Sequence, residues 1–327
     1  MNLRIFKPLT ITLLGLIASP ALGQNVTNKW PDLPIRLAVP FPAGSATDSV
    51  ARIVGQKLSS RLGQQLVVEN RVGASGNIGS DMVAKASPDG YTMGLITAST
   101  HAVAPSLGEL LPYDPIKDFK PISMIAAAPY ALVIYAGIPV NNLSELVALA
   151  KSKPGALNYG SAGLASLAHL AGALFATQTG TEITHIPYRS TAQSSMDIIT
   201  GRLDMQFATV APSLANIRDG KLKALATTGR KRLFVLPDTP TMMESGVPDY
   251  EVSLWMAFAM PSNTPDEIVA KLNREMTAIL NDPETVSALQ QQGFEPDPGP
   301  SQAVTALIRS EIEKWRALVE KTGIKTK

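Results

Sequence analysis

The 327-residue sequence contains no cysteine. This absence excludes a disulfide framework, a zinc site built on thiolates and a lipid anchor attached through a cysteine. The three histidines, His101, His169 and His185, are far apart in the sequence and form no i, i+4 pair of the kind that binds zinc. We therefore expect no metal and no cofactor, and a fold that is stabilised by its apolar core alone.

The sequence also lacks an excess of charge of either sign. It has 29 lysines and arginines against 27 aspartates and glutamates, and residues 1–23 contain two of the basic residues and no acidic one. A chain that is neutral beyond residue 23 and has no basic cluster is not typical of proteins that bind nucleic acid or anionic membranes. We expect neither as a partner.

Long apolar runs are missing as well. The stretch around residues 124–138 is interrupted by Pro129 and Gly137. The run at residues 9–18 is shorter than the roughly 20 residues that a membrane-spanning helix needs. No segment of the sequence is therefore predicted to cross a bilayer.

The short apolar run is part of a predicted export signal, residues 1–23. Arg4 and Lys7 precede it, and Ala21 and Gly23 supply the small side chains of a cleavage site. We expect cleavage near Gly23–Gln24 and a product without stable membrane insertion; the alternative is an uncleaved N-terminal anchor helix. Cleavage leaves 304 residues, more than one hydrophobic core usually supports, so two domains are expected.

Hydrophobic periodicity predicts strands and helices in alternation, which indicates parallel sheets covered by helices. The predicted strands are residues 35–39, 66–68, 92–96, 157–159, 182–186, 205–208, 223–227 and 252–260, with a strand pair at 122–134. The predicted helices are residues 48–63, 78–86, 143–151, 167–177, 192–200, 265–281, 283–292 and 301–321. The pattern is that of an α/β protein.

The last three predicted helices have no strands of their own, so they must pack back onto the first sheet. The chain then crosses twice between two lobes, near residues 125 and 253. We expect lobe 1 to comprise residues 24–124 and 254–327, and lobe 2 residues 125–253. Such hinged architectures bind ligands in the cleft between the lobes.

Four loops that follow predicted strands are small, hydroxyl-bearing and nearly uncharged. They are residues 41–48, 97–101, 160–166 and 208–209. Loops of this kind let backbone amides approach an anion, and the positive end of a helix dipole favours the anion. Taken singly, each loop is better explained by ordinary helix capping. Four loops that converge on one cleft favour anion binding.

Motifs for catalysis are weak. Residues 159–163 approach the nucleophile-elbow pattern, but Tyr159 stands where glycine is required. Gly73, Gly76 and Gly79 fit neither a dinucleotide-binding nor a phosphate-binding loop. The rival to a binding protein is a secreted hydrolase that uses Ser161 with a distant histidine, which requires a base within hydrogen-bond reach.

The order and spacing of several short segments resemble the substrate-binding proteins of tripartite tricarboxylate transporters, also called the Bug family, over the whole mature chain. These segments are Pro34–Leu37, Pro40–Gly44 with Asp48, Val68–Arg71, Pro88–Tyr91, Tyr113–Pro115, Lys117–Phe119, Ser161–Gly163 with His169, Ile186–Tyr188, Pro240–Thr241 and Glu311–Trp315.

The resemblance implies a type 2-like periplasmic binding protein fold with two lobes, two crossover strands and a ligand cleft. It implies a monomeric periplasmic receptor, not an enzyme, that closes on a small di- or tricarboxylate, aromatic acid or amino acid and delivers it to membrane permease subunits. A receptor that serves a sensor kinase is the alternative. The implied ligand-binding positions are Ala43, Gly44, Ser45, Asp48, Ser161, Ala162, Gly163 and Ser166, with Thr97 and Thr209 as secondary candidates.

Two departures from the family pattern bear on the ligand. The first loop has Ala43-Gly44-Ser45 where Pro-Gly-Gly is usual, and Ala208 stands where an aspartate is frequent. These changes favour a less polar pocket and hence an aromatic or longer-chain acid.

Overall fold

The computed structural model describes residues 30–325. The predicted export signal and its cleavage site lie outside this range. Within it, no helix combines the length and the apolar character that crossing a membrane requires.

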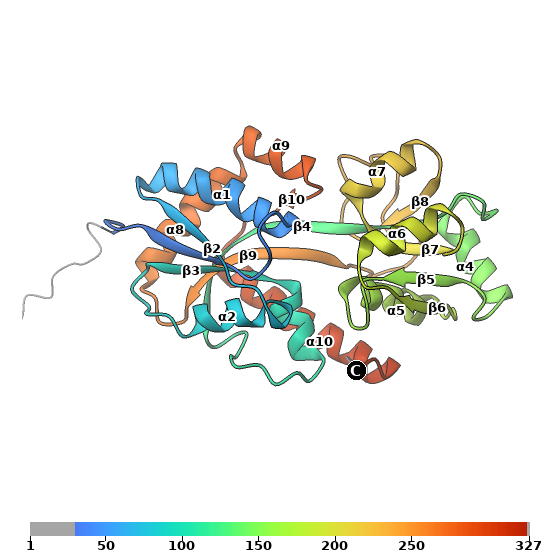
Figure 1. Cartoon of the computed structure of the whole chain (residues 1–327), viewed down its shortest axis with the longest axis horizontal. Helices are drawn as coiled ribbons and strands as arrows, with labels where there is room; N and C mark the ends of the chain where they lie inside the picture. Colours follow the sequence, from blue (N-terminus) through green and yellow to red (C-terminus); the bar gives the residue numbers. More distant parts are fainter. Residues whose placement is uncertain (1–29, 326–327) are drawn as a thin grey trace, which may run out of the picture.

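The first lobe is built on three parallel strands with helices on both faces (Figure 1). Its elements are β1 (Ile35–Val39), α1 (Ala46–Leu62), β2 (Leu66–Asn70), a 3-10 turn (Ala74–Gly76), α2 (Asn77–Ala84), β3 (Thr92–Thr97), a π-helical turn (Ser99–Val103) and α3 (Ala104–Ser106). The predicted order of strands and helices in this lobe is confirmed.

The second lobe repeats the alternation. Its elements are α4 (Leu143–Ser152), β5 (Asn158–Ser161), α5 (Leu167–Thr179), β6 (Thr184–Pro187), α6 (Thr191–Ile199), β7 (Met205–Thr209), α7 (Val210–Arg218) and β8 (Leu222–Thr227). Helix α7 was not predicted, since residues between the strands at 205–208 and 223–227 were assigned to no element. Pro212 lies in the first turn, where a backbone N–H would have no partner within the helix, so the proline is tolerated.

Two long strands, β4 (Phe119–Tyr135) and β9 (Ser253–Pro261), run through the centre of the molecule (Figure 1). They join the parallel strands of both lobes into one mixed sheet of order β2-β1-β3-β9-β4-β7-β5-β6, with β8 and β10 also paired to β4. Strands β4 and β9 pair antiparallel with their neighbours, whereas the outer strands of each lobe pair in parallel.

The predicted strand pair at residues 122–134 is wrong, because β4 is a single strand. Pro129 is compatible with it because the pairing partner changes at this point. Residues up to Pro129 pair with β9, and from Tyr130 onward they pair with β7. A ladder position without an N–H is least costly at such a break.

The C-terminal segment packs on elements of the first lobe. It forms α8 (Asp266–Leu280), α9 (Pro283–Gln291), the short strand β10 (Glu295–Pro296) and α10 (Ser301–Thr322). Strand β10, which pairs with β4, corrects the expectation that no strand remains. Helix α8 packs on β4 and α1, and α10 packs on β4, the π-helical turn and α5. Helix α10 therefore touches both lobes.

The apolar core has three parts. One lies beneath α1 and α8 in the first lobe, and one lies in the second lobe around Ala131 and Leu203. The largest is continuous from Ile96 in the first lobe to Phe175 in the second and includes Trp315 of α10. The lobes thus share one packed layer on the side of α10.

Candidate ligand-binding site

The first predicted ligand loop connects β1 to α1, and its backbone is fixed by its own polar groups. Ser45 is the N-cap of α1 and accepts the backbone N–H of Asp48 at 3.2 Å. Gly44 has φ +78°, a conformation that glycine adopts without steric cost, and donates its N–H to Asp48 Oδ2 at 2.9 Å. Ala43 and Gly44 are exposed and Ser45 is half-buried. These three residues are therefore open to a ligand.

Asp48 holds this loop from within and is only 2% exposed. Its Oδ2 also accepts Arg52 Nε at 2.8 Å, and its Oδ1 accepts Asn70 Nδ2 at 2.8 Å. Asn70 Nδ2 donates to the carbonyl of Phe41 as well, at 2.9 Å. Burial raises the pKa of the Asp48 carboxyl, but the hydrogen bonds from Arg52, Asn70 and Gly44 outweigh burial and lower this pKa below its ordinary value. Asp48 is thus ionised and fully occupied by protein donors.

The second predicted ligand loop connects β5 to α5. Ser161 ends β5 and is 1% exposed, and its Oγ lies 2.7 Å from His185 Nε2. The Ser161 hydroxyl also donates to the carbonyl of Gly163 at 2.9 Å. Ser166 is the N-cap of α5 and donates to the same carbonyl at 2.8 Å. Ala162 is exposed, whereas Gly163 and Ser166 are half-buried.

A stacked pair of imidazole rings lies beneath this second loop. His169 and His185 have ring centroids 3.8 Å apart and an interplanar angle of 8°. His169 Nδ1 accepts the backbone N–H of Ala165 at 3.0 Å. Burial lowers the pKa of His169 to about 4, with repulsion from His185 acting in the same direction, and burial lowers the pKa of His185 to about 4. Both rings are therefore neutral at pH 7.

Each loop leaves backbone amides unpaired at the start of its helix. Within the part of the chain that the structure describes, the following N–H groups have no acceptor: Ala43, Ala46 and Thr47 in the first loop, and Ala162, Leu164, Leu167 and Ala168 in the second. Unpaired first-turn amides at the positive end of a helix dipole favour an anion, by roughly 0.3–1 kcal/mol per exposed terminus.

The secondary candidates differ from each other. Thr97 has no exposed surface, and its N–H donates to Thr100 Oγ1 at 3.2 Å. Thr209 is half-buried at the N-cap of α7, and its side chain caps no amide there. Ala208 is 1% exposed and belongs to the apolar core of the second lobe, so its methyl group does not face solvent.

Within each loop, the structure places the predicted residues next to one another. No hydrogen bond joins the two loops anywhere in residues 30–325. Asn70 and His185 were not among the predicted site residues, although each anchors a loop. The pattern of a capping serine followed three residues later by a polar acceptor, present at Ser45–Asp48 and at Ser166–His169, could have indicated how both loops are held.

The hydrolase alternative meets its distance condition, since His185 is within reach of Ser161. Other requirements are not met. Ser161 is buried, and while its hydroxyl hydrogen is donated to the Gly163 carbonyl, His185 acts as a donor to Ser161 rather than as its base. A pKa of about 4 also leaves the imidazole poorly matched to general-base catalysis near pH 7.

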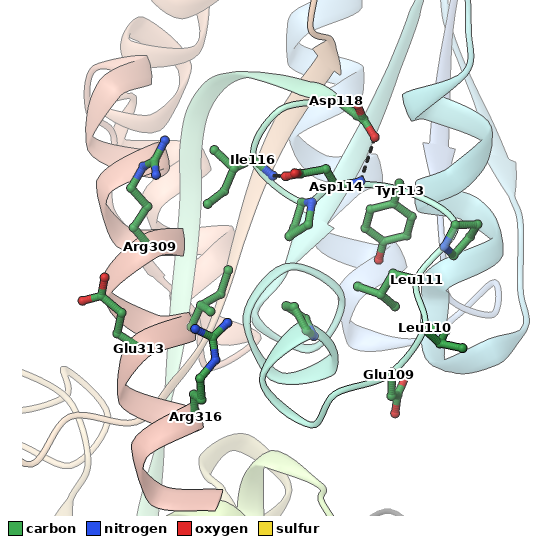
Figure 2. A pocket seen from close by; sticks show the side chains of 14 residues that line it. Glu109, Leu110, Leu111, Tyr113, Asp114, Ile116, Asp118, Arg309, Glu313 and Arg316 are labelled. Carbon is green, nitrogen blue, oxygen red and sulfur yellow. Dashed lines mark hydrogen bonds between the residues drawn. The ribbon is translucent and has the colours of Figure 1, made fainter. Parts of the chain in front are cut away.

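A cavity of about 720 Å³ lies on another face of the molecule, between α10 and residues 105–118 (Figure 2). Arg309, Glu313 and Arg316 line it from α10, and Leu110 on the opposite side is fully exposed. None of the predicted ligand-binding residues lines it. This cavity is therefore separate from the two loops.

Comparison with known proteins relates the chain to a receptor family. The tripartite tricarboxylate transporter family receptor matches residues 50–324. Protein BugT of Bordetella pertussis is 35% identical over 320 residues, which are 97% of this chain and 98% of BugT.

Two solved structures with bound dicarboxylates are similar to this chain over about nine tenths of its length. R. palustris Rpa4515 with adipate is 36% identical, has a TM-score of 0.75, and aligns over 90% of this chain and 99% of that one. MatC from Rhodopseudomonas palustris with bound malate is 30% identical, has a TM-score of 0.71, and aligns over 89% of this chain and 100% of that one. The two-lobed mixed-sheet fold is therefore that of a periplasmic binding protein, and the chain belongs to the tripartite tricarboxylate transporter family of solute-binding receptors.

Proposed function

We propose that the protein captures a small dicarboxylate between its two lobes and delivers it to the membrane permease subunits of a tripartite transporter. The observation that carries the proposal is the pair of loops before α1 and α5. Each presents unpaired helix N-terminal amides beside a capping serine, and among the described residues 30–325 no cationic side chain takes part in the hydrogen bonds of the second loop. The adipate and malate in the two related structures support a dicarboxylate.

Backbone amides and hydroxyls suit a ligand that must be released again. A fully desolvated ion pair with an arginine would bind a carboxylate through strong, charge-assisted hydrogen bonds. Neutral donors at a helix terminus select the negative charge with a smaller gain per contact. Ala43, Gly44, Ser45, Ala162, Gly163, Ser166 and Thr209 are the proposed contacts, with Asp48 and Ser161 holding the loops from behind.

We further infer how the receptor works in the cell. The two lobes, residues 24–124 with 254–327 and residues 125–253, would close by bending near residues 125 and 253. The change of strand partner at Pro129 supports a bend in β4. The protein would act as a periplasmic monomer without chemical turnover of its ligand.

A thermal-shift titration of the mature protein tests the ligand class. The panel contains adipate, malate, benzoate and aspartate, with adipamide as an uncharged analogue of adipate. A ligand present at about 100 times its dissociation constant adds about 2.7 kcal/mol to the free energy of unfolding. For a chain of this size, the melting temperature should rise by about 5 °C.

The expected result is a rise with adipate or malate and none with adipamide. If benzoate alone raises the melting temperature, the ligand is an aromatic acid and not a dicarboxylate. If adipamide acts as well as adipate, or if no acid has any effect, the two loops are not an anion-binding site and the proposal fails.

A further inference from the structure

His169 reaches back over the N-terminus of its own helix. It is the third residue of α5, is 6% exposed, and its Nδ1 accepts the N–H of Ala165, the residue before the N-cap. Because a backbone N–H can only donate, Nδ1 carries no proton and the neutral ring is protonated at Nε2. The tautomer of His169 is therefore fixed by the loop.

The same relationship occurs in two other helices. In α1, Asp48 accepts the N–H of Gly44 at 2.9 Å, and in α4, Glu145 accepts the N–H of Asn141 at 2.7 Å. Ala165 differs in backbone conformation from Gly44 and Asn141, the donors in α1 and α4. Its φ is +56°, whereas Gly44 is a glycine and Asn141 does not have a positive φ. Only at Ala165 does the bond hold a side-chain-bearing residue in the left-handed conformation, which is unfavourable for such residues.

The choice of acceptor also differs between the loops. Asp48 is negatively charged, but Arg52 Nε lies 2.8 Å from its Oδ2 and balances the charge. At position 169 the side chain packs directly on the ring of His185. A neutral imidazole can accept the amide there without placing a negative charge beside an anion-binding loop.

We propose that His169 is a positioning residue for the second ligand loop: its neutral ring holds the Ala165 N–H, and thereby orients the amides of Ala162 and Leu164 toward the bound carboxylate. His185, stacked on His169 and hydrogen-bonded to Ser161, braces the ring from the other side. This inference rests on the proposed function, because it assigns the loop's amides to a carboxylate.

Three substitutions of His169 distinguish the effect of a hydrogen-bond acceptor at this position from the effect of a charge there. His169→Asn places a neutral amide oxygen near the position of Nδ1, His169→Asp places a charged oxygen there, and His169→Leu offers no acceptor. Glu145→Leu is the matched control, since it removes the equivalent bond from α4. The two readouts are hydrogen–deuterium exchange of residues 160–170 in the ligand-free protein and the dissociation constant for adipate.

We expect His169→Leu to speed exchange of the loop and to weaken adipate binding about tenfold, a change equivalent to about 1.4 kcal/mol. His169→Asn should stay within about threefold of wild type in both readouts, as a neutral acceptor should. His169→Asp should protect the loop as well as His169→Asn does but weaken adipate binding about tenfold, because two like charges repel. Glu145→Leu should change neither readout.

Ala165→Gly provides a second test of the strained backbone. Because glycine adopts a positive φ freely, adding Ala165→Gly to His169→Leu should restore most of the adipate affinity. If His169→Leu behaves like wild type, or if His169→Asn is as weak as His169→Leu, His169 does not act through its acceptor and the inference is overturned. Absence of adipate and malate binding in the wild-type protein would instead sink the proposed function, and the exchange comparison would still report on the His169–Ala165 bond.

Discussion

Gly44 and Ala165 occupy the same position in the two lobes. Each is the residue before an N-cap serine, each has a positive φ, and each donates its backbone N–H to the side chain four residues later. The acceptor is the ionised Asp48 in one lobe and the neutral His169 in the other. The two loops are therefore held by the same local geometry with side chains of different charge, and substitutions at these acceptors should act on the ligand through the loop.

The first prediction concerns the Asp48 carboxylate, which holds the first loop. Asp48→Ala removes the acceptor for Gly44, Arg52 and Asn70 at once, although Gly44 and Arg52 are exposed enough to bond to water and Asn70 keeps the Phe41 carbonyl as an acceptor. A hydrogen bond to a charged group contributes about 1.5–3 kcal/mol, so loss of the three bonds to the carboxylate should destabilise the loop. We expect a lower melting temperature and at least about tenfold weaker adipate binding, since the loop loses its anchor. Calorimetric titration and thermal unfolding measure the two effects.

Arg61→Ala is the control on the same helix. Arg61 lies in the last turn of α1 and pairs with Glu275, and its side chain is 47% exposed. Exposed ion pairs contribute about 0–1 kcal/mol, so this variant should change stability little and adipate affinity not at all. Equal losses of affinity in both variants would mean that α1 as a whole, and not the Asp48 contacts, determines binding.

Gly79 allows a test of how the first loop is supported. A Cβ atom at Gly79 would lie 2.8 Å from Pro40 Cβ and 2.9 Å from the Arg71 carbonyl oxygen, both too close to be tolerated without movement. Overpacking of this kind costs about 1–3 kcal/mol. Gly79→Ala should therefore lower the free energy of unfolding in urea and displace the start of the loop at Pro40.

Gly299→Ala is the matched glycine control, because a Cβ atom there meets nothing within 4 Å and φ is not positive. Its stability should equal that of wild type or exceed it slightly, since alanine restricts the unfolded chain. If Gly79→Ala is as stable as Gly299→Ala, the close packing of α2 beneath Pro40 does not constrain the loop.

Much of the fold could be predicted from the sequence because many of its helices and strands have periodic apolar residues and are bounded by glycine or proline. The path of β4 through Pro129 could not, since it depends on a change of strand partner that only the assembled sheet reveals. Helix α7 was missed as well, since it is a short helix of nine residues that contains Pro212 in its first turn.

The candidate site, too, could be predicted only in part from the sequence. The loops could be located from their composition, because small and hydroxyl-bearing residues follow each strand. The sequence could not distinguish the exposed contacts, such as Ala43 and Ala162, from residues that are buried, such as Asp48, Thr97 and Ser161. Burial depends on side chains from distant segments, as the stacking of His185 on His169 illustrates.

Ser161 should stabilise its loop without acting as a nucleophile. We expect the wild-type protein to hydrolyse p-nitrophenyl acetate no faster than an equal concentration of free imidazole. Ser161→Ala should remove the hydrogen bonds to Gly163 and His185 and weaken adipate binding by a factor of about 5–10, as loss of a buried hydrogen bond would. Ester hydrolysis that disappears in Ser161→Ala would instead reveal a serine nucleophile.

The lowered pKa values of the three histidines determine how the free energy of unfolding should depend on pH. Burial lowers the pKa of His101 to about 3 and those of His169 and His185 to about 4, against an ordinary value near 6.5. The unfolded chain therefore takes up protons that the folded chain refuses as the pH falls from about 6.5 to about 4. As the pH falls, stability decreases wherever the unfolded state binds more protons than the folded state. The free energy of unfolding should therefore be greatest above pH 6.5 and decrease as the pH falls from about 6.5 to about 4.

Urea unfolding at intervals between pH 7.5 and 4.5 measures this decline. The pKa values of four carboxyl groups, Asp48, Asp114, Glu244 and Asp282, are lowered by their hydrogen bonds. These groups lose their contributions as the pH falls through the ordinary values of 3.8 and 4.5, so the part of the curve above about pH 5 reports on the histidines. His185→Asn removes one titrating ring, and the decline should become shallower in this variant, although its stability at pH 7.5 is lower. A free energy of unfolding that stays level from pH 7 to pH 5 in the wild-type protein would show that the histidines take up protons in the folded state, and the neutral stacked pair would then be wrong.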